Sequence, residues 1–203
     1  IAYSGYTYRY VTEIRGHKIG FGGCRETVWR QKPEIMREDL QALREEGCEV
    51  IVYSCHWGKE YAARHNERQE KMAREAIDGG ADLLIGETLL YAQEAEAILT
   101  AAELEGAGAT MISFTMQSGG YLFNGTDAGP LFQDLEAWGA AALGFNCVAA
   151  DDMTPHLVSR LRRFTRLPIL CKPNAGMPVI DEKGAAQYDM GPDSFAQVIA
   201  ACR

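Results

Sequence analysis

The sequence lacks three features that would each point to a particular class of protein. Its six cysteines include no Cys-x-x-Cys pair, which argues against a disulfide framework. No apolar run approaches the roughly 20 residues that a membrane-spanning helix needs. Positive charge is also scarce, because 20 Lys and Arg residues face 28 Asp and Glu residues and leave a net charge of -8. We therefore expect neither a membrane nor a nucleic acid as the partner.

The start of the chain bears on its location. Secretory signal peptides have a charged start followed by an apolar segment, and no such segment opens this sequence. We therefore expect a cytoplasmic protein whose thiols are reduced and mostly buried. The chain begins at Ile1 rather than at a methionine, which predicts a piece of a longer protein. Its 203 residues suffice for a single domain with a sizeable core.

Apolar segments of strand length alternate with helical segments along the chain. The predicted strands are 18–23, 49–55, 81–86, 110–116, 141–147 and 167–173. The predicted helices are 33–47, 66–80, 91–106, 127–139, 154–164 and 193–203. This alternation predicts an α/β fold of repeated βα units around a parallel sheet. A complete eight-stranded barrel typically needs about 250 residues, so we expect a partial TIM-barrel-like arrangement or an open α/β sandwich.

Polar side chains gather where the last four predicted strands end. They are Glu87, Ser113, Asn146, Cys147 and Asn174. In parallel α/β folds, function concentrates at this end of the strands. A carboxylate, a hydroxyl, two amides and a thiol would suit a small ligand that carries an ammonium and a carboxylate group. The alternative is that each group only caps a strand or fixes a loop.

The same clusters belong to four longer motifs. In chain order they are "DGGADLLIGET" (78–88), "SFTMQSGGYLFNGTD" (113–127), "GFNC" (144–147) and "PNAGMP" (173–178). Together, over residues 78–200, they resemble the homocysteine S-methyltransferase family, whose homocysteine-binding barrel uses zinc. The resemblance implies that Cys147 is a zinc ligand. It also implies that Glu87, Asn146 and Asn174, with Ser113 nearby, line the amino-acid site.

One part of the family pattern has no counterpart in this sequence. The resemblance implies two further zinc ligands from a Gly-Gly-Cys-Cys motif at the eighth strand, and no such motif occurs here. A catalytic zinc site needs about three protein ligands, so Cys147 alone leaves the site incomplete. We therefore expect methyl transfer by this chain to be weak or absent.

The N-terminal part resembles a different family. The segments "EIRGHKIGFGG" (13–23) and "HWGKEY" (56–61), followed by "IDGGADLLIG" (77–86), are similar to the capsule-synthesis proteins of poly-gamma-glutamate, which have a metallophosphatase-like fold. This resemblance implies that His56 is a metal ligand and Glu60 a nearby polar group. Residues 1–86 and 78–203 would then be two fragments joined at a seam within 77–87, so the chain is interpreted as a chimera that forms one α/β domain.

Three functions are compatible with these patterns. The first is a homocysteine-binding, methyltransferase-like protein. The second is a non-enzymatic module that binds another protein or self-associates through an open sheet edge. The third is a metal-dependent hydrolase of the capsule-synthesis type, in which His56 holds the metal instead of Cys147.

Overall fold

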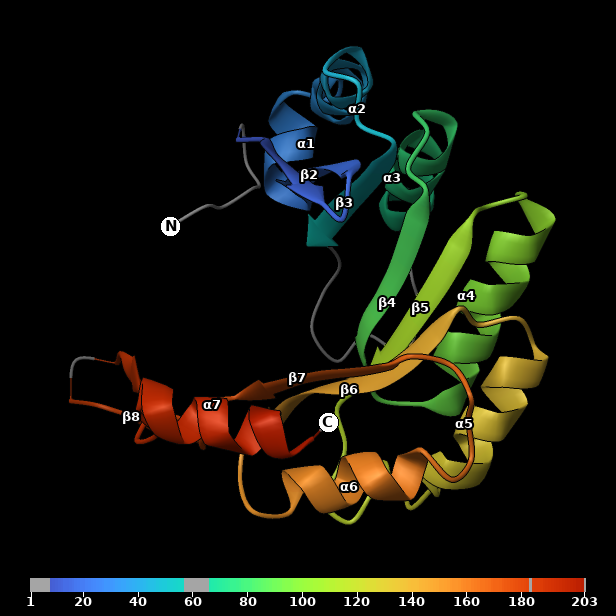
Figure 1. The fold of residues 1–203 in the computed structure, drawn as a ribbon. Coiled ribbons are helices and arrows are strands. Elements are labelled where there is room, and N and C mark those ends of the chain that lie inside the picture. Colours follow the sequence, from blue (N-terminus) through green and yellow to red (C-terminus); the bar gives the residue numbers. More distant parts are fainter. Residues whose placement is uncertain (1–7, 57–65, 183, 203) are drawn as a thin grey trace. The chain divides into compact units, whose positions relative to one another are not determined.

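The computed structural model describes residues 8–56, 66–182 and 184–202 (Figure 1). Within it the chain forms two compact units, which are described separately. Unit 1 comprises Ile1–Leu84 and Gly106–Ala109, and unit 2 comprises Ile85–Glu105 and Thr110–Arg203. The strand β4 (Leu83–Leu89) begins in unit 1 and continues into unit 2.

Unit 1 is built around a small sheet with helices against it. Its elements are β1 (Tyr10–Ile14), β2 (His17–Arg25), α1 (Glu26–Gln31), α2 (Ile35–Glu45), β3 (Val50–His56), α3 (Glu67–Asp78) and the start of β4. The strands β1 and β2 form an antiparallel hairpin, whereas β2, β3 and β4 run parallel. The hairpin turns at Arg15 and Gly16, where φ is 53° and 84°. Positive φ at both central residues is typical of the tight turns that connect twisted strands.

The core of unit 1 forms because α2 and α3 each bury one face. On α2 the buried apolar residues recur at helical spacing, namely Ile35, Met36, Leu40 and Leu43. They pack with Ile51, Tyr53, Met72 and Ala76 of neighbouring elements. The helix α3 begins with a capping box, in which the Asn66 side chain accepts hydrogen bonds from the backbone of Arg68 and Gln69.

Unit 2 continues the alternation of strand and helix. After β4 its elements are α4 (Ala92–Leu104), β5 (Ala109–Phe114), α5 (Ala128–Ala137), β6 (Ala142–Ala149), α6 (Thr154–Leu161), β7 (Ile169–Asn174), β8 (Val179–Ile180), β9 (Ala186–Gln187) and α7 (Pro192–Ala201). The order of strands is β4, β5, β6 and β7, and β5, β6 and β7 pair in parallel. The short strands β8 and β9 form a separate antiparallel ribbon.

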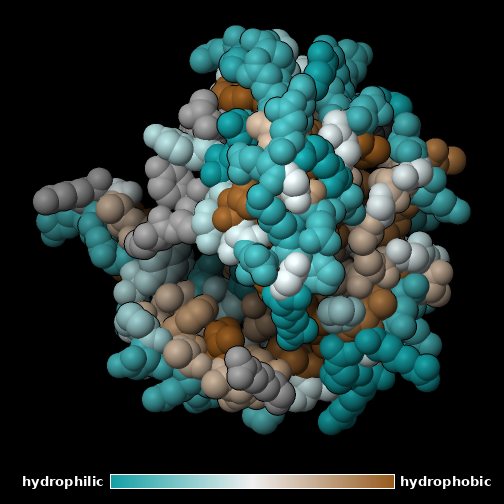
Figure 2. Space-filling view, turned by 45° about the horizontal axis from the view of Figure 1, so that its top comes forward, coloured by the Kyte–Doolittle hydropathy of each residue, from teal (hydrophilic) through white to brown (hydrophobic). Residues whose placement is uncertain are grey.

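The core of unit 2 is larger and contains most of the buried aromatic side chains. Phe114, Phe132 and Phe145 are fully buried, with the Phe114 and Phe132 ring centroids 6.4 Å apart. Aliphatic residues of β5, β6, α5 and α6 complete the cluster. Figure 2 shows hydrophilic side chains over much of the visible face, with hydrophobic ones in smaller areas between them. None of the helices in the described residues combines the length and the hydrophobicity that a membrane span requires.

The six predicted strands and six predicted helices are all present, which confirms the α/β fold of parallel βα units. Sequence reasoning missed β1, α1 and the β8–β9 ribbon, because these segments are short or partly exposed. All six cysteines are free thiols, and only Cys24 and Cys48 are buried, so the expectation that most of the thiols are buried is wrong. The boundary between the units falls at Leu84, inside the predicted seam. A division into two compact units does not show that the two parts have separate evolutionary origins, so the seam stays a prediction.

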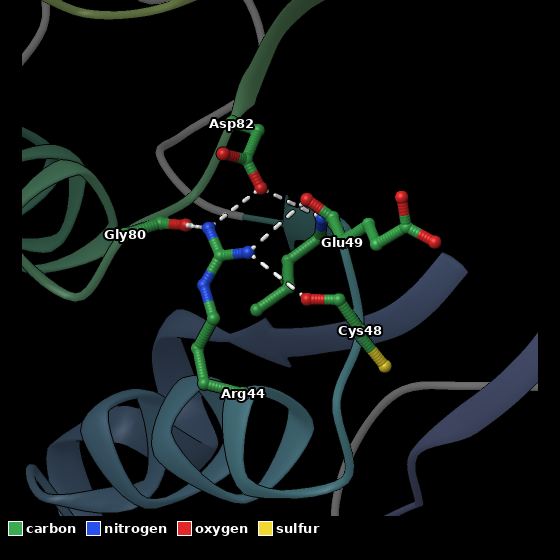
Figure 3. Close-up of polar contacts among 6 residues, drawn as sticks. Arg44, Cys48, Glu49, Gly80 and Asp82 are labelled. Carbon is green, nitrogen blue, oxygen red and sulfur yellow. Dashed lines mark hydrogen bonds and ion pairs between the residues drawn. The ribbon is translucent and has the colours of Figure 1, made fainter. Parts of the chain in front are cut away.

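A single arginine ties the parallel strands of unit 1 to their helices (Figure 3). In the last turn of α2, Arg44 donates through Nη2 to the Gly80 carbonyl at 2.6 Å and to the Asp82 carboxylate at 2.7 Å. Its Nη1 donates to the carbonyls of Cys48 and Glu49 just before β3, at 3.1 and 3.3 Å. A side chain can make all four of these contacts only if it carries several hydrogen-bond donors in one plane, which lysine does not.

We therefore predict that Arg44→Ala lowers the free energy of unfolding by about 1 kcal/mol, because net hydrogen bonds of this kind are individually modest. Arg44→Lys should recover less than half of that loss. Urea denaturation measures both, with the exposed Arg37 of the same helix as the control, since Arg37→Ala should change stability little. Full recovery of stability in Arg44→Lys would contradict the claim that the several donors of the guanidinium group are needed.

Candidate functional site

The ends of the four strands of unit 2 bring the predicted site residues of that unit together. Parallel pairing places Ser113 of β5 beside Gly144 of β6, and Asn146 of β6 beside Lys172 of β7. Hydrogen bonds join the end of β4 to the same group, as described below. The clusters that are far apart in the sequence therefore meet at one edge of the sheet.

The buried amide of Asn146 connects three of these strand ends. Its Oδ1 accepts from the Ser113 hydroxyl at 2.7 Å and from the Thr88 backbone N–H at 3.0 Å. Its Nδ2 donates to Thr88 Oγ1 at 2.5 Å and to Cys147 Sγ at 3.3 Å. Asn146 is 2% exposed and Ser113 is not exposed at all. Both ends of the amide are thus satisfied inside the protein, as a buried polar group requires.

The backbone at this network is held in an unusual conformation. Thr88 and Cys147 have φ values of 61° and 57°, in the left-handed region that side chains other than glycine seldom adopt. The pairing of β6 with β7 shifts register between Asn146 and Ala149, so Cys147 lies at a β-bulge. Bulges re-aim side chains at the ends of strands, and the Cys147 side chain is exposed. Such strain persists where surrounding contacts enforce it, and it is common at functional sites.

Charge at the site comes from an ion pair between β4 and β7. Lys172 Nζ contacts Glu87 Oε1, and the two side chains are 64% and 39% exposed. Sequence reasoning did not include Lys172 among the site residues. The available signal was its position two residues before Asn174, because alternate residues of a strand share a face. An exposed ion pair contributes little stability, so Glu87 can exchange this partner for another cation.

Asn174 is the last residue of β7 and the predicted site residue of that strand. Its backbone carbonyl accepts from the N–H groups of Ala150 and Gly176, both at 2.8 Å, which fixes the loop after the strand. The side chain is half-buried. In the described part of the chain its amide forms no hydrogen bond, so it can bind a ligand.

The predicted family uses a zinc ion, and a catalytic zinc needs about three protein ligands. Among the residues that the structure describes, no three His, Cys, Asp or Glu side chains lie close enough together to hold a metal. Cys171 of β7 pairs in register with the core residue Phe145, not with Asn146. Burial and the neighbouring Cys202 raise the pKa of the Cys171 thiol to about 12, so it remains protonated. The described residues therefore do not fit a complete zinc site around Cys147.

The alternative metal ligand lies in unit 1. His56 is the last residue of β3, paired in register with Arg25 of β2. Its side chain lies outside the part that the structure describes, as does Glu60. Metal binding at His56 thus stays a prediction.

Comparison with known proteins decides the family. The sequence model described as "Homocysteine S-methyltransferase" matches residues 53–202, which is most of the chain. The chain belongs to the homocysteine S-methyltransferase family. Among curated proteins, it is 32% identical over 130 residues to the methionine synthase of Mycobacterium tuberculosis. That match covers 61% of this chain but only 11% of the relative, so the chain spans a small part of that protein.

A solved structure shows the same fold. The apo homocysteine methyltransferase MmuM of Escherichia coli superimposes with a TM-score of 0.58 over 88% of this chain and 79% of that one, at 21% sequence identity. The likeness supports the TIM-barrel-like arrangement of βα units that the sequence predicted.

The second predicted resemblance receives weaker support. The PGA biosynthesis protein CapA of Bacillus subtilis is 32% identical over 77 residues, covering 37% of this chain and 20% of that protein. The methyltransferase match begins at residue 53, so it already includes part of the segment assigned to the capsule-synthesis family. A chimeric origin therefore stays a prediction.

The Asn146 network makes a quantitative prediction for this family member. Asn146→Ala leaves the buried Ser113 hydroxyl without its partner and removes two hydrogen bonds to Thr88, so it should destabilise the protein by roughly 1–3 kcal/mol. The double variant S113A/N146A should cost clearly less than the sum of the single changes, because both remove one shared hydrogen bond. Thermal and urea unfolding measure the cycle, with the exposed Ser118→Ala as control. Strictly additive costs would show that the two side chains act independently.

Proposed function

We propose that the strand-end site of unit 2 binds homocysteine as the methyl acceptor of an S-methyltransferase. The observation that carries the proposal is the exposed Glu87 carboxylate at the end of β4, where Asn146 joins the next residue, Thr88, to Cys147, in a chain of the homocysteine S-methyltransferase family. Family membership supplies the substrate class. The geometry supplies the groups that would recognise an amino acid.

Each half of an amino acid finds a partner among these side chains. The substrate ammonium replaces Lys172 at Glu87, which costs little because an exposed ion pair is weak. The freed Lys172 ammonium and the unoccupied Asn174 amide then donate to the substrate carboxylate. Asn146 and Ser113 do not contact the substrate in this proposal. Their buried hydrogen bonds hold Thr88 and Cys147 in place.

Turnover by this chain is expected to be weak or absent. A free thiol such as that of homocysteine has a pKa near 8.5 and is mostly protonated at neutral pH, so it needs activation to attack a methyl donor. Cys147 is the one thiol that the described site offers, and about three protein ligands are needed for a catalytic zinc. Recognition of the amino acid does not depend on those further ligands.

Calorimetric titration with L-homocysteine under reducing conditions, without added zinc, tests recognition directly. We predict a Kd on the order of 1 mM for the unmodified chain, because only polar contacts contribute. Glu87→Gln should weaken binding at least tenfold, since a neutral amide no longer attracts the substrate ammonium.

The matched control is the exposed Glu96→Gln within α4, which removes the same charge and changes none of the predicted site residues. It should bind homocysteine like the unmodified chain. Binding unaffected by Glu87→Gln, or the absence of binding at millimolar homocysteine, would refute the proposed site.

The other expectations stay open to separate tests. No contact among the described residues favours a capsule-type hydrolase or a protein-binding module over the methyltransferase-like function. Self-association through the sheet edge and a cytoplasmic location are predictions of the sequence alone.

A further inference from the structure

A cavity of about 380 Å³ lies on unit 2, formed by the end of α5 and the segment between α6 and β7. Its lining consists of Gln133, Glu136, Arg162, Arg163, Phe164, Thr165 and Arg166. These residues come before β7, whereas the homocysteine site follows the ends of the strands. In parallel βα units those two ends are opposite edges of the sheet. The cavity is therefore distinct from the proposed methyltransferase site.

Arginines dominate the charge of this cavity. Arg162 is committed to structure, because its Nη1 donates to the carbonyls of Thr165 and Leu167 at 3.1 and 2.8 Å. The guanidinium groups of Arg163 and Arg166 are exposed, and within the described residues they form no hydrogen bond or close ion pair. The guanidinium donors of Arg163 and Arg166 thus remain available, on a loop whose conformation the hydrogen bonds of Arg162 stabilise.

The single carboxylate of the lining is already engaged. Glu136 Oε2 accepts from the Thr165 hydroxyl at 2.5 Å and from the Arg166 backbone N–H at 2.9 Å. These bonds and the nearby Arg166 and Arg162 charges lower the pKa of Glu136, so it is ionised at neutral pH. Three arginines and one glutamate leave the lining with a formal charge of +2, in a chain whose net charge is -8.

We propose that this cavity binds a small molecule that carries a phosphoryl group. Guanidinium groups match phosphate oxygens with paired hydrogen bonds, and the cavity volume lies within the range of small-molecule sites. The acidic chain as a whole repels an extended polyanion, which argues for a compact ligand rather than a nucleic acid. The proposal does not rest on homocysteine binding.

Titration of the full chain with inorganic pyrophosphate, in chloride buffer of low ionic strength, tests this site. The unmodified chain should bind with a micromolar to millimolar Kd. The variants Arg163→Gln and Arg166→Gln should each weaken binding, and the double variant should lose at least tenfold in affinity. The control pair R30Q/R37Q removes two exposed arginines of unit 1 and should leave the affinity unchanged.

Circular dichroism on each variant checks that the fold is retained. Weaker binding by a single variant that keeps its fold then reports loss of the site and not loss of the fold. The proposal is overturned if the unmodified chain does not bind pyrophosphate, or if the double variant binds it as tightly. It is also overturned if citrate, an anion of comparable charge without phosphorus, binds as tightly as pyrophosphate.

Discussion

The site in unit 2 depends on one buried amide. Asn146 sits where β4, β5 and β6 end, and its two polar atoms contact a residue of each neighbouring element. A buried amide with any bond missing would cost free energy, so the surrounding chain adopts the backbone that satisfies it. Thr88 and Cys147 consequently take positive φ values. The buried hydrogen bonds of the Asn146 amide thereby fix the position of the exposed Cys147 thiol.

The motif Gly-Phe-Asn-Cys has a physical explanation at each position. A Cβ on Gly144 would lie 2.1 Å from the Leu170 carbonyl oxygen, so only glycine allows β6 and β7 to approach this closely. Phe145 fills the core, Asn146 forms the network, and Cys147 lies at the bulge. The four residues therefore couple strand packing to the exposed face of the site.

Much of this organisation could be predicted from the sequence, because its signals are local. Apolar strands and helix caps predicted the βα units, and parallel pairing then brought Glu87, Asn146 and Asn174 to one edge. Lys172 was missed because it lies within a mostly apolar strand and its partner Glu87 is 85 residues away in the sequence. The left-handed backbone of Cys147 could not be predicted, since tertiary hydrogen bonds impose it on a residue type that does not prefer it.

The proposed function treats these strand ends as an amino-acid site with a single thiol rather than a complete metal centre. Elemental mass spectrometry of the purified chain beside its Cys147→Ser variant tests it most directly. We predict far less than one zinc per chain in both proteins, with no difference between them. About one zinc per chain that is lost in the variant would contradict it, because the metal would then have found ligands that the described site does not supply.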